Sequence, residues 1–375
     1  MNSKTKKVLV PLVAIVFGFL LGAIIMLAFG YNPIWGYEDL FISALGNARA
    51  IGETLQTMGP LILTALSFAV AMKVGLFNIG MSGQALAGWI SSMWFALSFP
   101  DIPRLLMIPL VVIIGMFFGA FMGFIPGILR ALLGTSEVIT TIMLNYIMLF
   151  FSTFMIHSMF QKSILMDNTT DQTKLISANA SFRTNWMSSL TDNSTLNIGL
   201  IIALIALVIM AIIFTKTTLG FEIKAVGLNP NASEYAGISA KRTLILSMVV
   251  AGALAGLGGV VYGFGYMQNF VSQSASLDIG FNGMAVALLG GNSPIGILFA
   301  ALLFSVLQTG APGMTNDGIP PEIVKVVTAS IIFFIAVKFI IEVMLPKAKK
   351  SKHQKLLRRK EKKHESCKYF TNHCR

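Results

Sequence analysis

The side chains that could do chemistry in this chain are neutral amides and hydroxyls that stand within long apolar runs. A polar group in hydrocarbon costs free energy unless it is hydrogen-bonded, so such groups either join helices or line a path for a polar solute. Neutral groups suit a neutral, hydrogen-bonding substrate. The set comprises Asn78, Gln84, Thr140, Thr141, Asn145, Tyr146, Asn282 and Asn292.

Packing between helices is the favoured interpretation for any one of these residues, because Asn and Gln also stabilise membrane helix bundles. The pair Asn78 and Gln84 is the exception. Both stand beside a predicted break in the helical pattern, where we favour a role in the pathway.

No constellation in the sequence predicts catalysis or metal binding. Three of the four histidines stand in the C-terminal tail, and His157 stands alone. The two cysteines, Cys367 and Cys374, are also in the tail, without the spacing of a zinc site. A glycine-rich phosphate loop ending in Gly-Lys-Ser/Thr is absent, so any ATP that drives this protein would bind to a partner.

Ionisable residues are scarce in the apolar runs. Lys325, Lys338 and Glu342 fall in the last run, and Lys338 and Glu342, four residues apart, are expected to pair or to extend toward the inner interface. A proton-driven transporter usually carries carboxylates or histidines near the middle of the membrane. This scarcity argues against an ion-coupled secondary transporter.

Composition indicates that the elements holding these residues are membrane helices. The 375-residue chain is 55% hydrophobic and only 12% charged, with a mean hydropathy of +0.76. That charged fraction is about half of what soluble domains carry, and many runs approach the roughly 20 residues that cross a bilayer. We therefore predict an all-α membrane protein with about ten transmembrane helices. They are expected at 8–30, 56–72, 83–99, 105–129, 138–160, 197–215, 243–265, 279–290, 295–310 and 322–345.

The net charge of +12 gathers at the two ends of the chain. Residues 1–7 hold three basic residues, and 347–375 hold twelve basic and two acidic residues. Basic flanks mark the cytoplasmic side of membrane helices, so both termini are predicted to be cytoplasmic. Residues 1–345 would form the membrane domain and 346–375 a basic cytoplasmic tail, with no role in nucleic-acid binding. Both ends lie on one side of the membrane only if the number of crossings is even. The weakly apolar run 279–290 must therefore be counted as a crossing, which gives ten.

The long polar segments fit this orientation. Segment 216–242 holds four basic residues against two acidic ones and is predicted inside, whereas 161–196 is balanced and is predicted to be extracellular. Two membrane segments are interrupted, at 75–84 and at 278–292, as in transport pathways. The stretches Phe77–Met81 and Ile279–Met284 are faintly alike, which suggests duplicated halves.

The segment 219–240 contains a predicted short helix. Asn229-Pro230-Asn231 predicts a turn, after which Asn231 would cap the helix, with Glu234 three residues on, and Gly237 would end it. Such a helix between two spans could dock a soluble partner, or it could be an ordinary interfacial helix.

Four stretches resemble the permease subunits of bacterial ABC importers for branched-chain amino acids, ribose and nucleosides, and most resemble the nucleoside branch. They are Gly75–Gln84, Glu137–Tyr146, Ala225–Ile238 and Gly280–Gly290, within a resemblance that covers about residues 8–345. The third is shared across the group, and the other three together favour nucleosides over ribose or amino acids.

The resemblance implies an ATP-driven importer in the bacterial plasma membrane that takes up nucleosides by alternating access. It implies no enzymatic activity and no cofactor in this chain, since ATP and magnesium would be bound by a cytoplasmic ATPase subunit. It also implies a second, homologous permease chain, an extracellular substrate-binding lipoprotein and contact with membrane lipid. A sugar or branched-chain amino acid permease is the first alternative, and an ion-coupled secondary transporter is the alternative from another class.

The residues expected to carry these roles form two sets. The predicted substrate pathway comprises Asn78, Ser82, Gln84, Thr141, Asn145, Tyr146, Asp278, Phe281 and Asn282. The predicted coupling surface for the ATPase comprises Gly220, Glu222, Gly227, Asn229, Asn231, Ala232, Tyr235, Ala236, Gly237 and Ile238. Ser82 and Asn282 depart from the family, which often has Glu and Asp there. Either the specificity has shifted or these are packing positions.

Overall fold

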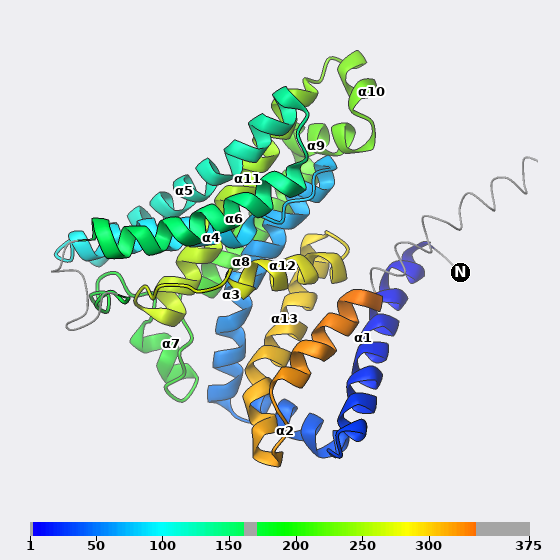
Figure 1. Cartoon of the computed structure of the whole chain (residues 1–375), viewed down its shortest axis with the longest axis vertical. Coiled ribbons are helices and arrows are strands. Elements are labelled where there is room, and N and C mark those ends of the chain that lie inside the picture. Colours follow the sequence, from blue (N-terminus) through cyan, green and yellow to red (C-terminus); the bar gives the residue numbers. More distant parts are fainter. Residues whose placement is uncertain (1–2, 161–170, 335–375) are drawn as a thin grey trace, which may run out of the picture.

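The computed structural model describes residues 3–160 and 171–334, and it is built from helices (Figure 1). The described residues form no β-strand, only isolated bridges between Gln172 and Val271 and between Arg183 and Asn197. Six described helical segments are long and apolar enough to cross a membrane: Ala48–Val74, Arg104–Leu133, Glu137–Ser158, Gly199–Lys216, Ala240–Met267 and Pro294–Asp317. The prediction of an all-α chain with several membrane helices is therefore confirmed, whereas the count of ten stays a prediction.

The elements follow the apolar runs with shifted ends. They are α1 (Ser3–Ala28), α2 (Pro33–Leu45), α3 (Ala48–Val74), α4 (Met81–Ser98), α5 (Arg104–Leu133), α6 (Glu137–Phe154), α7 (Asn185–Leu190), α8 (Gly199–Lys216), α9 (Thr218–Leu228), α10 (Pro230–Tyr235), α11 (Ala240–Val261), α12 (Asp278–Leu289) and α13 (Pro294–Gly310). Two π-helices, η1 (Met155–Met159) and η2 (Tyr262–Met267), continue α6 and α11, and a 3₁₀-helix, η3 (Ala311–Asp317), continues α13. A last helical stretch covers 322–334. Lys338, Glu342 and the tail lie outside the described residues.

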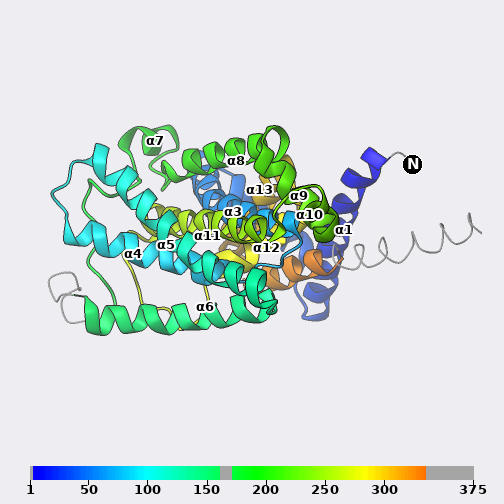
Figure 2. The same ribbon diagram turned by 90° about the horizontal axis from the view of Figure 1, so that it is seen from above.

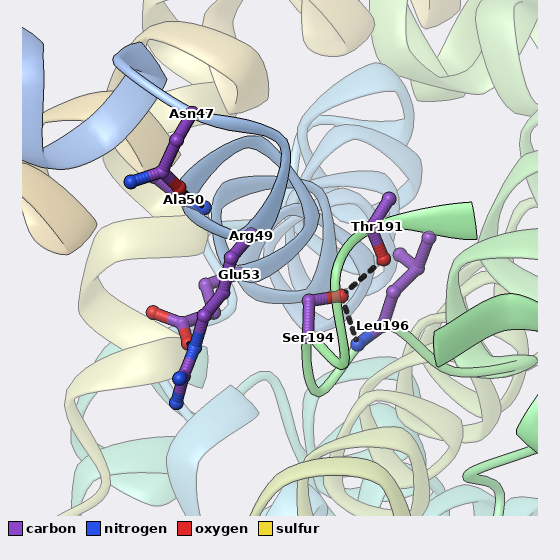
Figure 3. Close-up of polar contacts among 7 residues, drawn as sticks. All are labelled: Asn47, Arg49, Ala50, Glu53, Thr191, Ser194 and Leu196. Atoms are coloured by element: carbon purple, nitrogen blue, oxygen red, sulfur yellow. Dashed lines mark hydrogen bonds and ion pairs between the residues drawn. The ribbon is translucent and has the colours of Figure 1, made fainter. Parts of the chain in front are cut away.

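The stretch between the first two predicted spans, expected to be a polar connection, is helical. The side chain of Asn32 caps α2, which begins at Pro33. Asn47 caps α3 by accepting a 2.8 Å hydrogen bond from the Ala50 amide. Arg49 and Glu53 form a 3.0 Å ion pair one helical turn apart (Figure 3).

The predicted crossing at 279–290 corresponds to α12, which has 12 residues. At 1.5 Å per residue it extends about 18 Å, less than the roughly 30 Å of a hydrocarbon core. The helix is continuous from Asp278 to Leu289, so the interruption predicted within 278–292 falls at its C-terminal end. The irregular backbone lies before it, at 268–277, and after it, at 290–293.

Helix α11 lies at the centre of the bundle, against α3, α4 and α5. Glycines make its contact with α5 a close approach of two backbones. A Cβ on Gly119 of α5 would lie 2.4 Å from the Gly252 carbonyl oxygen, and a Cβ on Gly256 of α11 would lie 2.3 Å from that of Gly115. Small residues allow such packing in membranes, where helices gain little from excluding water.

The two long polar segments lie at opposite ends of α11 (Figures 1 and 2). Helices α9 and α10 precede its first residue, Ala240. The segment 171–197, which contains α7, packs beside η2 at the other end, where Phe182 donates its amide to the Phe264 carbonyl at 3.2 Å. We call these the α10 end and the η2 end.

Candidate functional site

The break between α3 and α4 is closed by a pair of side-chain amides. Helix α3 ends at Gly75, whose φ of 88° is a left-handed conformation that favours glycine. Asn78 donates to Gln84 Oε1 at 3.0 Å, and Gln84 donates back to Asn78 Oδ1 at 3.3 Å. Asn78 Oδ1 also accepts from the Gly80 amide at 3.0 Å. Both side chains are buried.

Asn145 of α6 holds the same break from the other side. Its Oδ1 accepts from the Gly83 amide at 2.8 Å, and its Nδ2 donates to the Ile79 carbonyl at 3.0 Å. The nearby Thr141 hydroxyl is buried and donates within its own helix, to Val138 at 3.1 Å. These amides satisfy backbone groups that the missing helical turn leaves open.

Ser82 joins the first interrupted stretch to the second. Its hydroxyl donates to the Leu277 carbonyl at 2.8 Å, and a Cβ on Gly280 would lie 2.3 Å from Ser82 Oγ. A longer acidic side chain at 82 would collide with the start of α12. The structure thus gives Ser82 a packing contact, one of the two explanations open for its departure from the family.

The structure therefore brings five predicted pathway residues together as one cluster. Asn78, Ser82, Gln84, Thr141 and Asn145 are all buried, and their hydrogen bonds go to one another or to the backbone. In this conformation their contacts are those of helix packing.

The remaining predicted pathway residues are accessible. On α12, Asp278 is exposed, Phe281 is 44% exposed and Asn282 is partly buried. Asp278 and Asn282 stand one turn apart on this helix. Tyr146 of α6 is 54% exposed, although the adjacent Asn145 is buried. Accessible polar and aromatic side chains thus stand on α12, which contacts α4, and separately on α6, next to the buried Asn145.

The short helix in the coupling segment exists, but its cap differs from the prediction. Helix α10 begins at Pro230, and Asn229, not Asn231, is the cap, because Asn229 Oδ1 accepts from the Ala232 amide at 3.1 Å. Pro230 at the first helical position explains the shift, since proline fits there and the cap must precede it. Gly237 follows the helix with a φ of 84°, as a residue that ends a helix does.

The predicted coupling residues divide into a packed group and a free group. A Cβ added to Gly220 would lie 2.0 Å from the Ile213 carbonyl oxygen. A Cβ added to Gly227 would lie 2.1 Å from the Lys73 carbonyl oxygen, so both positions need glycine. Glu222 accepts from the Thr243 hydroxyl at 3.5 Å. Ile238 is partly buried, and the free side chains are those of Asn231, Ala232, Tyr235 and Ala236.

Sequence reasoning missed the clamp at the η2 end, which consists of segment 171–183, residues 264–272 and Arg104. Backbone hydrogen bonds join Thr173 to Phe270 and Ile176 to Gln268, each at 2.9 Å. Arg104 donates to the carbonyls of Ser181 at 3.0 Å and Arg183 at 2.9 Å. Balanced charge in 161–196 gave no indication that this segment binds Arg104 through its backbone carbonyls.

No group of His, Cys, Asp and Glu that could hold a metal ion occurs within 3–160 and 171–334. Arg183 donates to the carbonyls of Gly265 at 3.2 Å and Tyr266 at 2.9 Å. Burial lowers the pKa of this guanidinium, which lies outside the membrane-spanning helices. These contacts position a backbone segment and supply no chemistry of their own.

Comparison with known proteins places these features in a family. The family described as the permease component of the branched-chain amino acid transport system matches residues 50–336. The nucleoside ABC transporter permease protein NupB of Lactococcus lactis is 94% identical over 96% of this chain and 99% of its own length. The guanosine ABC transporter permease protein NupP of Bacillus subtilis is 42% identical over 93% of this chain and 99% of its own.

A more distant relative is named for a different substrate. The glucose ABC transporter permease protein TsgB13 of Haloferax volcanii is 29% identical over 87% of this chain and 86% of its own. No solved structure is significantly similar to the chain.

Proposed function

This chain belongs to the permease component family of the branched-chain amino acid transport system, and on that premise we propose that it is the membrane subunit of an ATP-driven importer of nucleosides. The observation that carries the proposal is the 94% identity to a nucleoside permease over 96% of the chain. The chain is a transporter subunit and not an enzyme. The sugar alternative rests on a relative with 29% identity.

The transport mechanism we propose is alternating access along α4, which α6 and α12 each contact. In this conformation Asn78, Gln84 and Asn145 hydrogen-bond within the α3–α4 break, while Asp278 and Phe281 of α12 are exposed. A change of access would exchange these hydrogen bonds for others, with the substrate among the partners.

The bilayer arrangement is proposed from charge and length. Both termini and the α10 end would be cytoplasmic, and the η2 end extracellular. The described spans leave α1, α4, α12 and the stretch from 322 to supply the other four crossings of a ten-span chain. Helix α12 would need irregular backbone to complete its crossing. Duplicated halves are supported by the two interrupted stretches, which meet at Ser82 and Gly280.

The partners we propose follow from what the two ends leave open. The α10 end exposes Tyr235, which is 94% accessible, and Leu228, which is 88% accessible, as a helix that docks into an ATPase would. ATP and magnesium would bind to that subunit. A second homologous permease chain, an extracellular substrate-binding lipoprotein and membrane lipid would complete the assembly, without nucleic acid.

The substrate is tested by uptake. We expect cells that lack the gene to lose accumulation of radiolabelled guanosine or adenosine and to regain it with the cloned gene. Labelled ribose, glucose and leucine serve as controls. Unchanged nucleoside uptake, together with lost sugar or amino acid uptake, would refute the nucleoside assignment.

The docking role of α10 is tested at Ala236. This exposed position can accept a large charged side chain without disturbing the fold, unlike Gly227, where the Lys73 carbonyl oxygen leaves no room. We expect Ala236→Arg to reduce co-purification of the ATPase and to stop transport. Ser136→Arg is the matched control, because Ser136 is exposed in the α5–α6 connection at the same end. Normal co-purification and transport in Ala236→Arg would show that α10 does not dock the ATPase.

A further inference from the structure

Two tyrosines at the η2 end form an aromatic platform that the sequence patterns did not single out. Tyr262 and Tyr266 lie four residues apart in the π-helix η2, with ring centroids 5.7 Å apart and planes inclined by 25°. Tyr266 is 52% exposed and Tyr262 is partly buried. The Tyr266 ring is therefore accessible to solvent, and the Tyr262 ring stacks against it. π-Helical turns frequently occur at functional sites.

The platform is held by contacts on its buried side. The Trp89 ring, which is fully buried, meets Tyr262 edge-on, with centroids 5.3 Å apart and an interplanar angle of 89°. Arg183 binds the Tyr266 carbonyl at 2.9 Å. The Gln268 side chain donates to Ser181 Oγ at 2.8 Å directly after η2. An exposed aromatic ring fixed in this way loses little conformational freedom when a ligand stacks on it.

A carboxylate stands at the start of α12, which packs on the helix that supports the platform. Asp278 follows Leu277, whose carbonyl accepts from the Ser82 hydroxyl of α4 at 2.8 Å, and Trp89, which supports Tyr262, lies two turns further along α4. Asp278 is exposed, and none of its atoms forms an ion pair with any residue of 3–160 or 171–334. A carboxylate is an acceptor for adjacent hydroxyl groups, as on a ribose ring, and an aromatic face is a surface on which a base can stack.

We propose that Tyr262 and Tyr266 form a base-stacking platform for the nucleoside, with Asp278 as the acceptor for the ribose hydroxyls. This inference rests on the proposed function and adds to it the groups that recognise the two halves of the substrate. The alternative is that Tyr266 is an interfacial tyrosine that anchors the helix at the membrane surface.

The stacking role is tested by binding of tritiated guanosine to the purified transporter, with its ATPase and without the substrate-binding lipoprotein, by scintillation proximity. Omitting the lipoprotein removes the subunit that would otherwise set the measured affinity. We expect Tyr266→Leu to raise Kd about tenfold and Tyr266→Phe to leave it within about twofold, because only Phe retains the stack. Trp186→Leu is the matched control, since Trp186 is an aromatic residue of α7 with 56% exposure at the same end.

Three outcomes would overturn the platform. They are an unchanged Kd in Tyr266→Leu, an equal loss in Tyr266→Phe, and an equal loss in Trp186→Leu, which would indicate a general effect of interfacial aromatics. Guanosine uptake by cells that carry the wild-type gene distinguishes a failure of the proposed nucleoside import from a failure of the tyrosine platform. If uptake occurs but the platform variants bind normally, only the platform is wrong. If the wild type supports no uptake, the proposed function fails and the platform fails with it.

The ribose role of Asp278 is tested in the same binding assay with 2′,3′-dideoxyguanosine as competitor. We expect the wild type to prefer guanosine about tenfold and Asp278→Asn to lose that preference, because a charged acceptor bound to hydroxyls is replaced by a neutral amide. A preference that persists in Asp278→Asn would show that Asp278 does not bind the sugar.

Discussion

The two ends of α11 differ in how far the chain completes its own contacts. At the η2 end, segment 171–183 pairs with 264–272 through backbone hydrogen bonds, and two arginines bind carbonyls. At the α10 end, Ser233 is the one buried residue of α10, while Tyr235 and Leu228 are almost fully exposed. An end that is satisfied within the chain is built to hold its shape. A short helix with one buried residue and a nearly fully exposed tyrosine leaves a surface open to a partner.

The difference between the two ends can affect transport only if α11 connects them rigidly. Replacing a glycine in the contact between α11 and α5 would disrupt that connection. In Gly256→Leu the Cβ would lie 2.3 Å from the Gly115 carbonyl oxygen. We expect a loss of about 3 kcal/mol or more in the free energy of unfolding, since backbone cannot move aside cheaply. Thermal unfolding in detergent would measure it.

A matched control exists on the same helix. Ala253 is partly exposed, so Ala253→Leu should leave the unfolding transition nearly unchanged. If Gly256→Leu unfolded at the wild-type temperature, α5 and α11 would not pack as described, and α11 would not be a strut.

The clamp at the η2 end is tested by removing Arg183. Its guanidinium donates to the carbonyls of Gly265 and Tyr266, and in Arg183→Gln both bonds are lost. We expect the free energy of unfolding to fall by about 1–2 kcal/mol, because the side chain is only partly buried and water replaces some of what is lost.

The control for the charge itself is Arg49→Gln. Arg49 pairs with Glu53 at an exposed position of α3, so its loss should cost less than about 0.5 kcal/mol. Equal effects of the two substitutions would mean that the η2 end gains nothing from the carbonyl contacts, and the contrast between the ends would weaken.

The sequence predicted the long apolar helices and the short helix α10, but not α7 or α9, nor the contacts at either end. Apolar runs locate membrane helices because each run must bury its length in lipid. Arg49 and Glu53 lie outside the predicted spans, yet charges four residues apart suit an exposed helical turn. The resemblance to known permeases identified the family that the comparisons then showed.

The partners of buried side chains were beyond reach of the sequence. Asn78 and Gln84 are six residues apart, and nothing in that spacing indicates that each binds the other and not a solute. Asn145 bonds to backbone more than sixty residues away in the chain. Such pairings depend on which helices are neighbours, and this is set by three-dimensional packing, not by local pattern.

The α10 end offers a smaller and more local test, at the cap of its helix. In Asn229→Ala the hydrogen bond to the Ala232 amide is lost, and we expect α10 to lose about 1 kcal/mol of local stability. Asn231→Ala, two residues further along the chain, removes no cap and serves as the control. Hydrogen exchange at the amides of 232–238 would show faster exchange in the first variant only. Faster exchange in Asn231→Ala alone would restore Asn231 as the cap.

We expect the smallest change in the free energy of unfolding from a substitution of Tyr235. A substitution there therefore distinguishes an effect on docking from an effect on stability. A ring that is 94% exposed contributes almost nothing to the folded chain, so Tyr235→Ala should alter the free energy of unfolding by less than about 0.5 kcal/mol. The same substitution should weaken co-purification of the ATPase several-fold, because an aromatic ring buried only in the complex is a typical binding hot spot. Leu175→Ala, at a 70% exposed position of the η2 end, should change neither quantity.

A destabilised Tyr235→Ala would mean that α10 already packs against the chain. A stable variant that binds the ATPase normally would mean that the exposed ring serves another partner, and the α10 end would then differ from the η2 end in exposure without differing in role.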